Sequence, residues 1–205
     1  MSERQRQGER SREAILDAAE RLMASGGYTA TSITRVRAES GLPASSIYWH
    51  FGSKQGLLAA VMERGARRWF AAIPTWDEVD VPEGDKLDAM LRVWAQALAT
   101  EPQFMRLSFM LSLEDTDDPA VAAIVRRVRD SAIERFHQAV QGLIPADVPP
   151  QRAERAADEL TRILVALSDG FFFAAHLEPE TTDLERLCLQ AGRIIEALLP
   201  ALLEE

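Results

Sequence analysis

Apolar residues recur through most of the chain at spacings of three and four residues, which is the period of an amphipathic helix. The clearest stripe near the N-terminus consists of Ile15, Ala18, Ala19, Leu22 and Met23. Together these patterns predict about nine helices, near residues 11–25, 32–39, 44–50, 53–73, 86–100, 102–114, 119–142, 151–176 and 183–203. We therefore expect an all-α fold.

Glycines and prolines mark the predicted helix ends. Gly26 and Gly27 close the first helix, because glycine is common just after a helix C-terminus. Asp118 and Pro119 open the seventh helix as a side-chain cap followed by proline in the first turn. All ten prolines, Pro200 included, are expected at breaks or ends of helices, where the missing N–H costs little. Residues 76–85 are expected to form a loop.

The sequence gives no sign of secretion, of a membrane span or of a metal centre. The apolar runs 163–167 and 171–175 hold five residues each, far fewer than the ~20 needed to cross a bilayer. The first twelve residues are polar and Cys188 is the only cysteine, so we expect a cytoplasmic protein with no membrane contact. The three histidines lack metal-ligand spacing, so neither a metal nor a cofactor is expected.

Charge is distributed unevenly along the chain. The net charge is −9, yet residues 1–68 carry 11 basic and 7 acidic side chains, a net of +4, which leaves −13 for residues 69–205. This asymmetry indicates a basic module that meets a polyanion, joined to an acidic module with another task. Uneven surface composition alone remains an equally good explanation of the charge pattern.

Residues 31–54 contain two short predicted helices and a turn. Thr31 or Ser32 can cap the first helix, Gly41 allows a tight turn, and Pro43 starts a second helix that ends near His50. Helices this short are held by their neighbours. Two helices joined by a short glycine-containing turn form a helix-turn-helix, whose second helix enters the DNA major groove.

The same segment resembles the tetracycline-repressor (TetR) family of bacterial transcriptional regulators. The residues that carry the resemblance are Gly41-Leu42, Ala44-Ser45-Ser46, Ile47, Tyr48-Trp49-His50-Phe51 and Ser53-Lys54, with Ala18-Ala19, Gly27-Tyr28 and Thr31-Ser32-Ile33 upstream. The resemblance covers about residues 11–60. It implies a three-helix DNA-binding module over residues 1–55 and a ligand-sensing and dimerisation domain over residues 56–205.

The resemblance also implies a function and the residues that serve it. The protein would be a repressing regulator that binds a palindromic operator as a homodimer and is released by a small-molecule effector. The residues expected to contact double-stranded DNA are Thr31, Ser32, Arg35, Ala44, Ser45, Ser46, Tyr48, Trp49, His50 and Lys54. Small residues in the first turn of the second helix allow close approach to base edges, and Lys54 at a helix start suits a phosphate. A tryptophan such as Trp49 is otherwise more often part of a core.

The N-terminal arm and two unusual residues complete this module. Arg4, Arg6, Arg10 and Arg12 would add non-specific attraction to DNA. Arg37 stands four residues before Gly41, where helix-turn-helix proteins usually place a small residue, so its side chain must turn outward. Gly56 lies in the first turn of the next predicted helix, at a cost of up to ~1 kcal/mol.

The last two predicted helices contain apolar seams. Leu184, Leu187, Ala191, Ile194 and Leu198 step by three and four residues, and Leu160, Leu164 and Leu167 form a similar stripe. Two such helices from each of two chains would make a four-helix bundle across a two-fold axis. Burial against the chain's own helices explains the same pattern equally well without the family resemblance.

Candidate ligand residues are harder to choose. The acidic part holds more aromatic and methionine residues than one core stripe needs, which indicates an apolar pocket. We select Trp94, Phe109 and His176, although each alone is more often a core residue. An all-helical enzyme and a protein-binding adaptor remain alternative functions. Ser46 and His50 have no acid nearby in sequence that would orient a catalytic histidine, so we expect no catalytic residues and no enzyme.

Overall fold

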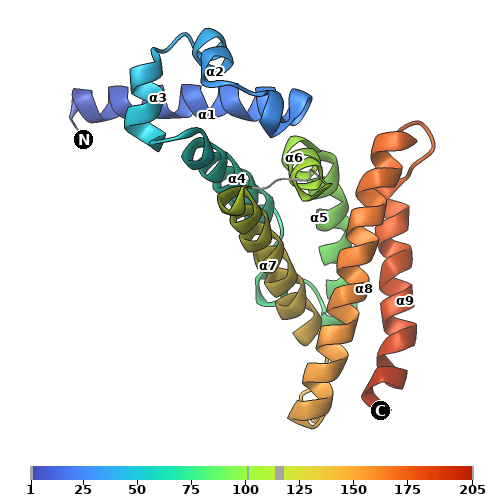
Figure 1. The fold of residues 1–205 in the computed structure, drawn as a ribbon. Helices are drawn as coiled ribbons and strands as arrows, with labels where there is room; N and C mark the ends of the chain where they lie inside the picture. The colour runs from blue at the N-terminus through green and yellow to red at the C-terminus, as the bar shows by residue number, and fades with distance from the viewer. Residues whose placement is uncertain (1, 101, 114–117, 205) are drawn as a thin grey trace. The chain divides into compact units, whose positions relative to one another are not determined.

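The computed structural model describes residues 2–100, 102–113 and 118–204, and within them the chain is helical with no strand (Figure 1). The nine α-helices are α1 Glu3–Ala30, α2 Ile33–Ser40, α3 Ala44–Phe51, α4 Lys54–Ala71, α5 Lys86–Thr100, α6 Pro102–Leu113, α7 Pro119–Gln141, α8 Pro150–Leu177 and α9 Leu184–Glu204. The all-α prediction is confirmed. The predicted loop at residues 76–85 contains two short 3₁₀ turns, η1 Trp76–Glu78 and η2 Glu83–Asp85.

α1 begins well before its predicted start. Ser2 accepts a hydrogen bond from the backbone N–H of Gln5, and the Gln5 side chain accepts one from the Ser2 backbone, which completes a capping box. This local cap starts the helix in a polar stretch that has no apolar stripe. Gly27, with φ 81°, interrupts the helical backbone close to the predicted end.

Two further expectations about helix ends have different outcomes. The side chain of Asp118 accepts from the backbone N–H of Ala120 at 2.9 Å, so the predicted cap of α7 is confirmed. Pro200 is inside α9 rather than at its end, and that prediction is wrong. The proline lies in the last turns of the helix beside the exposed Glu196, where water can satisfy the carbonyl that loses its partner.

The chain divides into two compact units. Unit 1 comprises Met1–Arg67 with Gln103–Val128, and unit 2 comprises Arg68–Pro102 with Arg129–Glu205. The helices α4 and α7 each contribute residues to both units. Each unit groups residues that lie close together in space. The predicted boundary at residue 55 instead separates DNA binding from ligand sensing and dimerisation, so that boundary stays a prediction.

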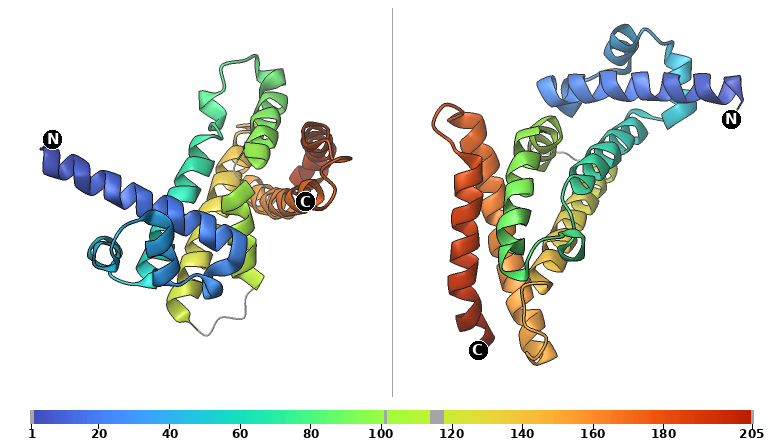
Figure 2. Two further views of the ribbon diagram at one scale, coloured as in Figure 1. Left: turned by 90° about the horizontal axis from the view of Figure 1, so that it is seen from above. Right: turned by 180° about the vertical axis from the view of Figure 1, so that it is seen from behind.

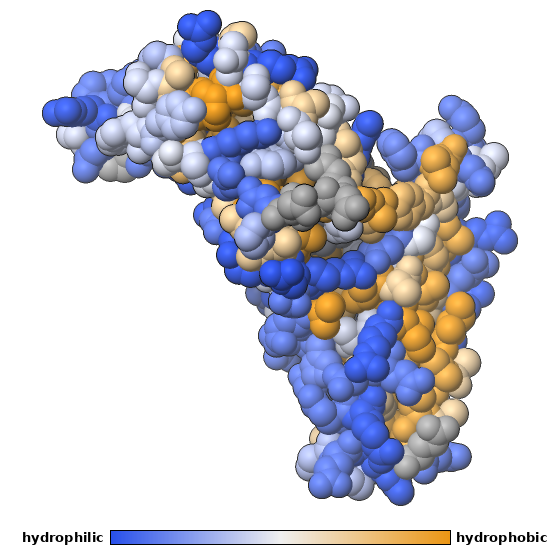
Figure 3. All heavy atoms as spheres, in the orientation of Figure 1, coloured by the Kyte–Doolittle hydropathy of each residue, from blue (hydrophilic) through white to orange (hydrophobic). Residues whose placement is uncertain are grey.

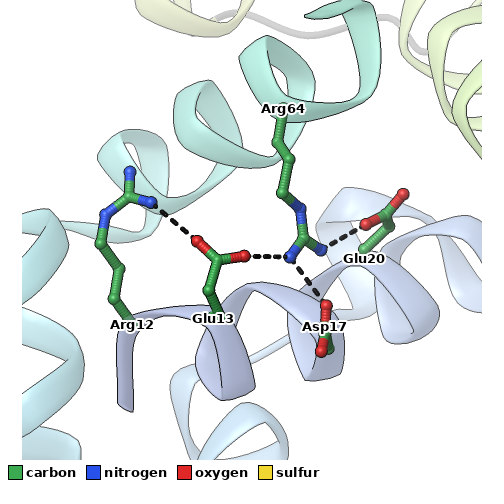
Figure 4. Close-up of polar contacts among 5 residues, drawn as sticks. All are labelled: Arg12, Glu13, Asp17, Glu20 and Arg64. Carbon is green, nitrogen blue, oxygen red and sulfur yellow. Dashed lines mark hydrogen bonds and ion pairs between the residues drawn. The ribbon is translucent and has the colours of Figure 1, made fainter. Parts of the chain in front are cut away.

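An ion-pair cluster fastens α4 to α1 within unit 1 (Figure 4). Arg64 of α4 donates to Asp17 at 2.7 Å, to Glu13 at 3.0 Å and to the buried carboxylate of Glu20. Burial lowers the pKa of Arg64, but these hydrogen bonds outweigh it, and the pKa ends above its ordinary value. Because Arg64 and Glu20 are both withdrawn from water, each depends on the other for its solvation.

Gly56 in unit 1 lies where a larger residue would not fit. A Cβ atom at this position would collide with the backbone carbonyl oxygen of Phe51. Only glycine lets the start of α4 follow so closely on the end of α3. Glycine lowers the helix propensity at this position, as expected from the sequence, but it permits a tight connection that any side chain with a Cβ would prevent.

Unit 2 is built around α9, which packs on both α5 and α8 (Figure 2). Gly192 of α9 lets the side chain of Leu91 of α5 approach its backbone, where a Cβ would collide. Arg129 of α7 and Asp169 of α8 form a two-bonded ion pair at 2.7 and 3.0 Å.

α8 is the one described helix that is long and apolar enough to cross a membrane by length and composition. The expectation from the sequence considered only uninterrupted apolar runs and did not identify it. One face of α8, which includes Ala157, Leu160 and Leu164, is buried inside unit 2. Packing against the other helices therefore accounts for part of its apolar content.

Candidate nucleic-acid interface

α2, a three-residue turn and α3 form the predicted helix-turn-helix in unit 1. The Ser32 side chain caps α2 by accepting from the backbone N–H of Arg35 at 3.2 Å. Gly41 adopts φ 69° and ends α2 in the left-handed conformation that favours glycine. Val36 and Ile47 hold the two helices on α1, since they are 0% and 1% exposed.

α3 buries one face and exposes the other. Ile47 faces the core, whereas Tyr48 is 52% exposed and Trp49 is 78% exposed. Ser45 is exposed and Ser46 is half-buried at the start of the helix, as is Ala44. The core alternative for Trp49 is thus wrong. An aromatic side chain left in water beside a tyrosine and two serines gives α3 a surface suited to bind another molecule.

His50 occupies the edge of this surface. Its ring lies 4.5 Å from the Trp49 ring, edge to face, and is half-buried. Burial lowers the pKa of His50, and the positive charge of Arg12 lowers it further. The imidazole is therefore mainly neutral at pH 7 in the free protein.

One predicted DNA contact does not reach the surface. Thr31 is 1% exposed, and its hydroxyl donates to the carbonyl oxygen of Gly27 at 2.8 Å. The hydroxyl closes the kink after α1, so its assignment as a DNA contact is corrected to a structural role. Ser32 and Arg35 are exposed, and the Arg35 guanidinium donates to the carbonyl oxygen of Ala30 at 3.0 Å.

Lys54 begins α4 next to its cap. Ser53 accepts from the backbone N–H of Gly56 at 3.0 Å, as the sequence indicates. The Lys54 ammonium lies 4.1 Å from the centre of the Tyr28 ring and donates to the carbonyl oxygen of Thr29 at 3.4 Å. A phosphate at this helix start would meet an ammonium already held near α1.

Other basic residues of unit 1 lie on α1 and α2. Arg37 is exposed, so the outward orientation predicted for it is confirmed. The expected arginine arm is part of α1 rather than a separate extended segment. Within it Arg6 pairs with Glu3 at 2.7 Å, and Arg12 lies 5.4 Å from the centre of the Phe51 ring.

Unit 2 contains a cavity of about 330 Å³ lined mainly by apolar and aromatic side chains. The lining comes from the end of α4, the following loop, α5, α7, α8 and α9. Trp94 of α5 lies there, 5.3 Å from the Phe136 ring and 6.1 Å from the Phe171 ring. The cavity has the size and character of a small-molecule site.

Two of the three candidate ligand residues do not line this cavity. Phe109 belongs to α6 in unit 1. His176 is exposed in the last turn of α8, where it stacks on Phe172 with the rings 6.0 Å apart. Sequence reasoning also missed Arg135, because an arginine on an otherwise amphipathic helix gives no sign that it faces a cavity.

The predicted dimerisation stripe is partly hidden. Leu160, Leu164 and Ala191 are 0%, 6% and 1% exposed, so they belong to the core of unit 2 and not to its surface. Leu167, Leu184, Leu187 and Leu198 are half-buried, and Ile194 is 52% exposed. Figure 3 shows hydrophobic residues along the side where α8 and α9 lie. On α8 the predicted stripe is therefore buried apart from the half-buried Leu167.

His137 of α7 lies between two carboxylates of α8. Its Nε2 atom is 3.6 Å from Glu154 and 3.4 Å from Asp158, and the three ligand atoms lie within 4.8 Å of one another. These residue types could hold a metal ion, and their separation along the chain explains why no motif announced them. Both carboxylates are exposed, so a histidine–carboxylate ion pair accounts for the same arrangement.

Together, a basic helix-turn-helix and a separate helical unit with a cavity define a DNA-binding regulator of transcription. Residues 15–61 match bacterial regulatory proteins of the tetR family. The chain is 26% identical over 192 residues to the HTH-type transcriptional regulator TtgR of Pseudomonas putida, covering 87% of this chain and 86% of the relative. The match to the tetR family therefore covers the helix-turn-helix together with the adjoining parts of α1 and α4.

Solved structures share the fold. A putative transcriptional regulator from Saccharomonospora viridis, in complex with choline, superposes with a TM-score of 0.70 at 20% identity, covering 92% of this chain and 96% of the other. SmeT, the repressor of a Stenotrophomonas maltophilia multidrug efflux pump, gives 0.66 at 24% identity over 91% and 88%. A SmeT–triclosan complex gives 0.69 at 22% identity over 91% and 90%.

Proposed function

We propose that the chain is a homodimeric repressor that binds a palindromic operator and releases it when a small molecule occupies the cavity of unit 2. The observation that carries the proposal is the exposed face of α3, where Tyr48 and Trp49 stand in water on a helix anchored by Ile47. Adjacent exposed aromatic side chains on one short helix are typical of a surface that binds a partner. The relatives named above are transcriptional regulators, and the proposal gives this chain no catalytic role.

The residues of unit 1 divide into those that position DNA and those that read it. Ser32, Arg35 and Lys54 are assigned to phosphates because they carry donors at or near helix starts, and Tyr48 is assigned to a phosphate because its exposed hydroxyl can donate. Ala44, Ser45, Ser46, Trp49 and His50 are assigned to the groove, because they lie on α3, the second helix of the motif. The basic balance of residues 1–68 supplies the salt-dependent part of the affinity.

The proposed dimer uses the exposed apolar stripes of α8 and α9. On α8 the stripe comprises Ile163, Ala166, Gly170, Phe173 and Leu177, which step by three and four residues. On α9 the half-exposed Leu187 and exposed Ile194 are seven residues apart. Stripes with this spacing on two antiparallel helices suit a four-helix bundle with a second copy.

α4 gives the proposed coupling its physical route. Within one helix it carries Arg64, which binds α1, and Trp69 and Phe70, which line the cavity. A ligand that fits better when α4 is displaced favours the arrangement that does not bind DNA. We place the protein in the cytoplasm, where a regulator of transcription meets bacterial DNA.

A selection from a random duplex pool tests the operator part of the proposal. The full chain is mixed with the pool, and bound duplexes are recovered and sequenced. We expect inverted repeats whose half-site centres are about one helical turn, ~10 base pairs, or a multiple apart. Enrichment of a single non-repeated site, or no enrichment, would contradict a dimer acting on a palindrome.

A further inference from the structure

Two buried N–H groups without a hydrogen-bond partner among the described residues belong to side chains that line the cavity of unit 2. They are Nε1 of Trp94 and Nε of Arg135. The Trp94 residue is 4% exposed, so bulk water does not compensate its indole N–H. A buried donor without an acceptor is costly, and two such donors on side chains that line a ligand-sized cavity point to an acceptor supplied by a bound molecule.

Arg135 is held in place by the backbone after α4. Its Nη2 donates to the carbonyl oxygen of Ile73 at 2.8 Å and to that of Phe70 at 3.3 Å. Both acceptors are neutral, and no carboxylate of the described residues lies within ion-pair distance of the guanidinium. The positive charge at the cavity therefore lacks a direct counter-charge.

Two acids near the cavity do not fill that role. Asp77 is part of the lining but is exposed to water. Glu78 accepts from the backbone N–H of Thr75 at 2.8 Å. Hydrogen bonds from Thr75, together with the positive charge of Arg135, hold the pKa of Glu78 below its usual range. Arg135 thus acts on Glu78 through space while its own Nε stays unpaired.

The remaining lining is suited to flat rings. Trp69, Trp76, Met90 and Phe136 line the cavity, so broad aromatic faces and a thioether surround most of its volume of about 330 Å³. Such walls bind aromatic groups by stacking and apolar burial. The aromatic walls therefore suit a ring of the bound molecule. The two unpartnered N–H groups suit an oxygen acceptor on that ring.

We propose that this cavity binds aromatic carboxylates, with the rings against the tryptophan and phenylalanine walls and the carboxylate accepting from Trp94 and Arg135. This inference rests on the proposed function, because it names the chemical class of the effector. The charge of Arg135 selects an acid over an amine of the same shape.

Calorimetric titration of the full chain with three two-ring probes tests the proposal. The probes are 1-naphthoate, neutral 1-naphthalenemethanol and cationic 1-naphthylmethylammonium, which share one ring system and differ in the charge of the substituent. We expect 1-naphthoate to bind roughly 10- to 100-fold more tightly than the ammonium probe, the range for hydrogen bonds to a charged group. Equal affinity, or a preference for the ammonium, would overturn the proposal.

Variants assign the preference to the two donors. Arg135→Met should remove most of the preference for 1-naphthoate, and Trp94→Phe should weaken binding of 1-naphthoate more than that of the neutral probe. Arg126→Met on the exposed face of α7 is the matched control and should keep the wild-type values. If Arg135→Met fails to fold, Trp94→Phe still decides, because it keeps a ring and removes only the donor. An unchanged preference in Trp94→Phe would contradict the assigned site.

The same probes separate this inference from the proposed function. Once an operator has been selected, 1-naphthoate is added to the protein–DNA complex. Selective binding of 1-naphthoate supports the inference even if the DNA stays bound. DNA that stays bound contradicts only the proposed release of the operator by the ligand. Release of DNA by the neutral or cationic probe, without acid preference, supports the effector role and overturns the inference.

Discussion

Arg64 of α4 and Glu20 of α1 form an ion pair in which both side chains are withdrawn from water, with 11% and 7% of their surface exposed. The pair joins two helices with different roles. α1 supports the helix-turn-helix, and α4 continues into the cavity wall of unit 2. The pair therefore fixes the second half of α4 to α1.

Removing one partner of this pair should destabilise the protein strongly. Arg64→Met takes from the buried Glu20 its hydrogen bond and ion pair with Arg64, and we expect a loss of about 3–5 kcal/mol in the free energy of unfolding. Glu13→Gln is the matched control, because Glu13 is 54% exposed and an exposed pair contributes ~0–1 kcal/mol. Urea denaturation measures both. Equal effects would mean that burial of Glu20 does not set the strength of the pair.

Trp49→Ala should weaken DNA binding without lowering the stability of the fold. The side chain is 78% exposed, so its removal leaves no cavity. Leu113→Ala at the end of α6 is the control, because Leu113 is an apolar residue with the same 78% exposure. Fluorescence anisotropy with a selected operator measures affinity, and thermal unfolding measures stability. A loss of affinity in Leu113→Ala as large as that in Trp49→Ala would argue against α3 as the contact.

His50 should make stability depend on pH below neutrality. Its pKa is lowered in the folded protein by burial and by Arg12, whereas the unfolded chain has the ordinary value of about 6.5. The unfolded chain therefore binds more protons, so the stabilising contribution of neutral His50 is present above pH ~6.5 and is lost as the pH falls through the lower folded pKa. We expect His50→Gln to lose less stability than wild type between pH 7.5 and 5.5. Identical losses would show that His50 plays no part.

Gly56→Ala should destabilise the protein, although alanine usually stabilises a helix by ~0.5–1 kcal/mol relative to glycine. The new Cβ would collide with the carbonyl oxygen of Phe51. Gly8→Ala in α1 is the control, because no atom lies near its Cβ position. Melting temperatures of the two variants should move in opposite directions, and a rise in both would remove the steric explanation.

Charges on the exposed stripe should separate the proposed dimer. Ala166→Glu with Ile194→Glu places carboxylates on exposed positions of α8 and α9, and we expect monomers in sedimentation velocity. Gln151→Glu adds the same charge at an exposed position of α8 outside the stripe and should leave the dimer intact. A tight dimer in the double variant would place the interface elsewhere.

Local patterns predicted most of the fold, because helix ends depend on neighbouring residues. Gly41, Pro43 and Ser53 each mark an end of α2, α3 or α4, and each lies within four residues of the atoms that it affects. The early start of α1 was also local: Ser2 and Gln5 form the cap, but no apolar stripe accompanies it. Periodicity alone could not reveal a helix made of exposed residues.

The sites were predicted less completely, because they depend on which helices meet. Tyr48 and Trp49 follow from the motif, whereas the burial of Thr31 depends on a kink at Gly27 that no spacing rule describes. Arg135 faces the cavity because its guanidinium reaches the carbonyl oxygens of Phe70 and Ile73, more than sixty residues earlier. Contacts at such separations leave no periodic signature in a single sequence.

The most direct test of the central claim, that α3 reads DNA while the start of α4 holds its backbone, is a specificity profile over all single-base variants of a selected operator. Ser46→Ala should change the preference at one or two base pairs in each half-site, by ~1–3 kcal/mol each. Lys54→Ala should weaken binding to every sequence alike and reduce the slope of log K against log salt by about one. An unchanged profile in Ser46→Ala, together with an altered one in Lys54→Ala, would contradict the account.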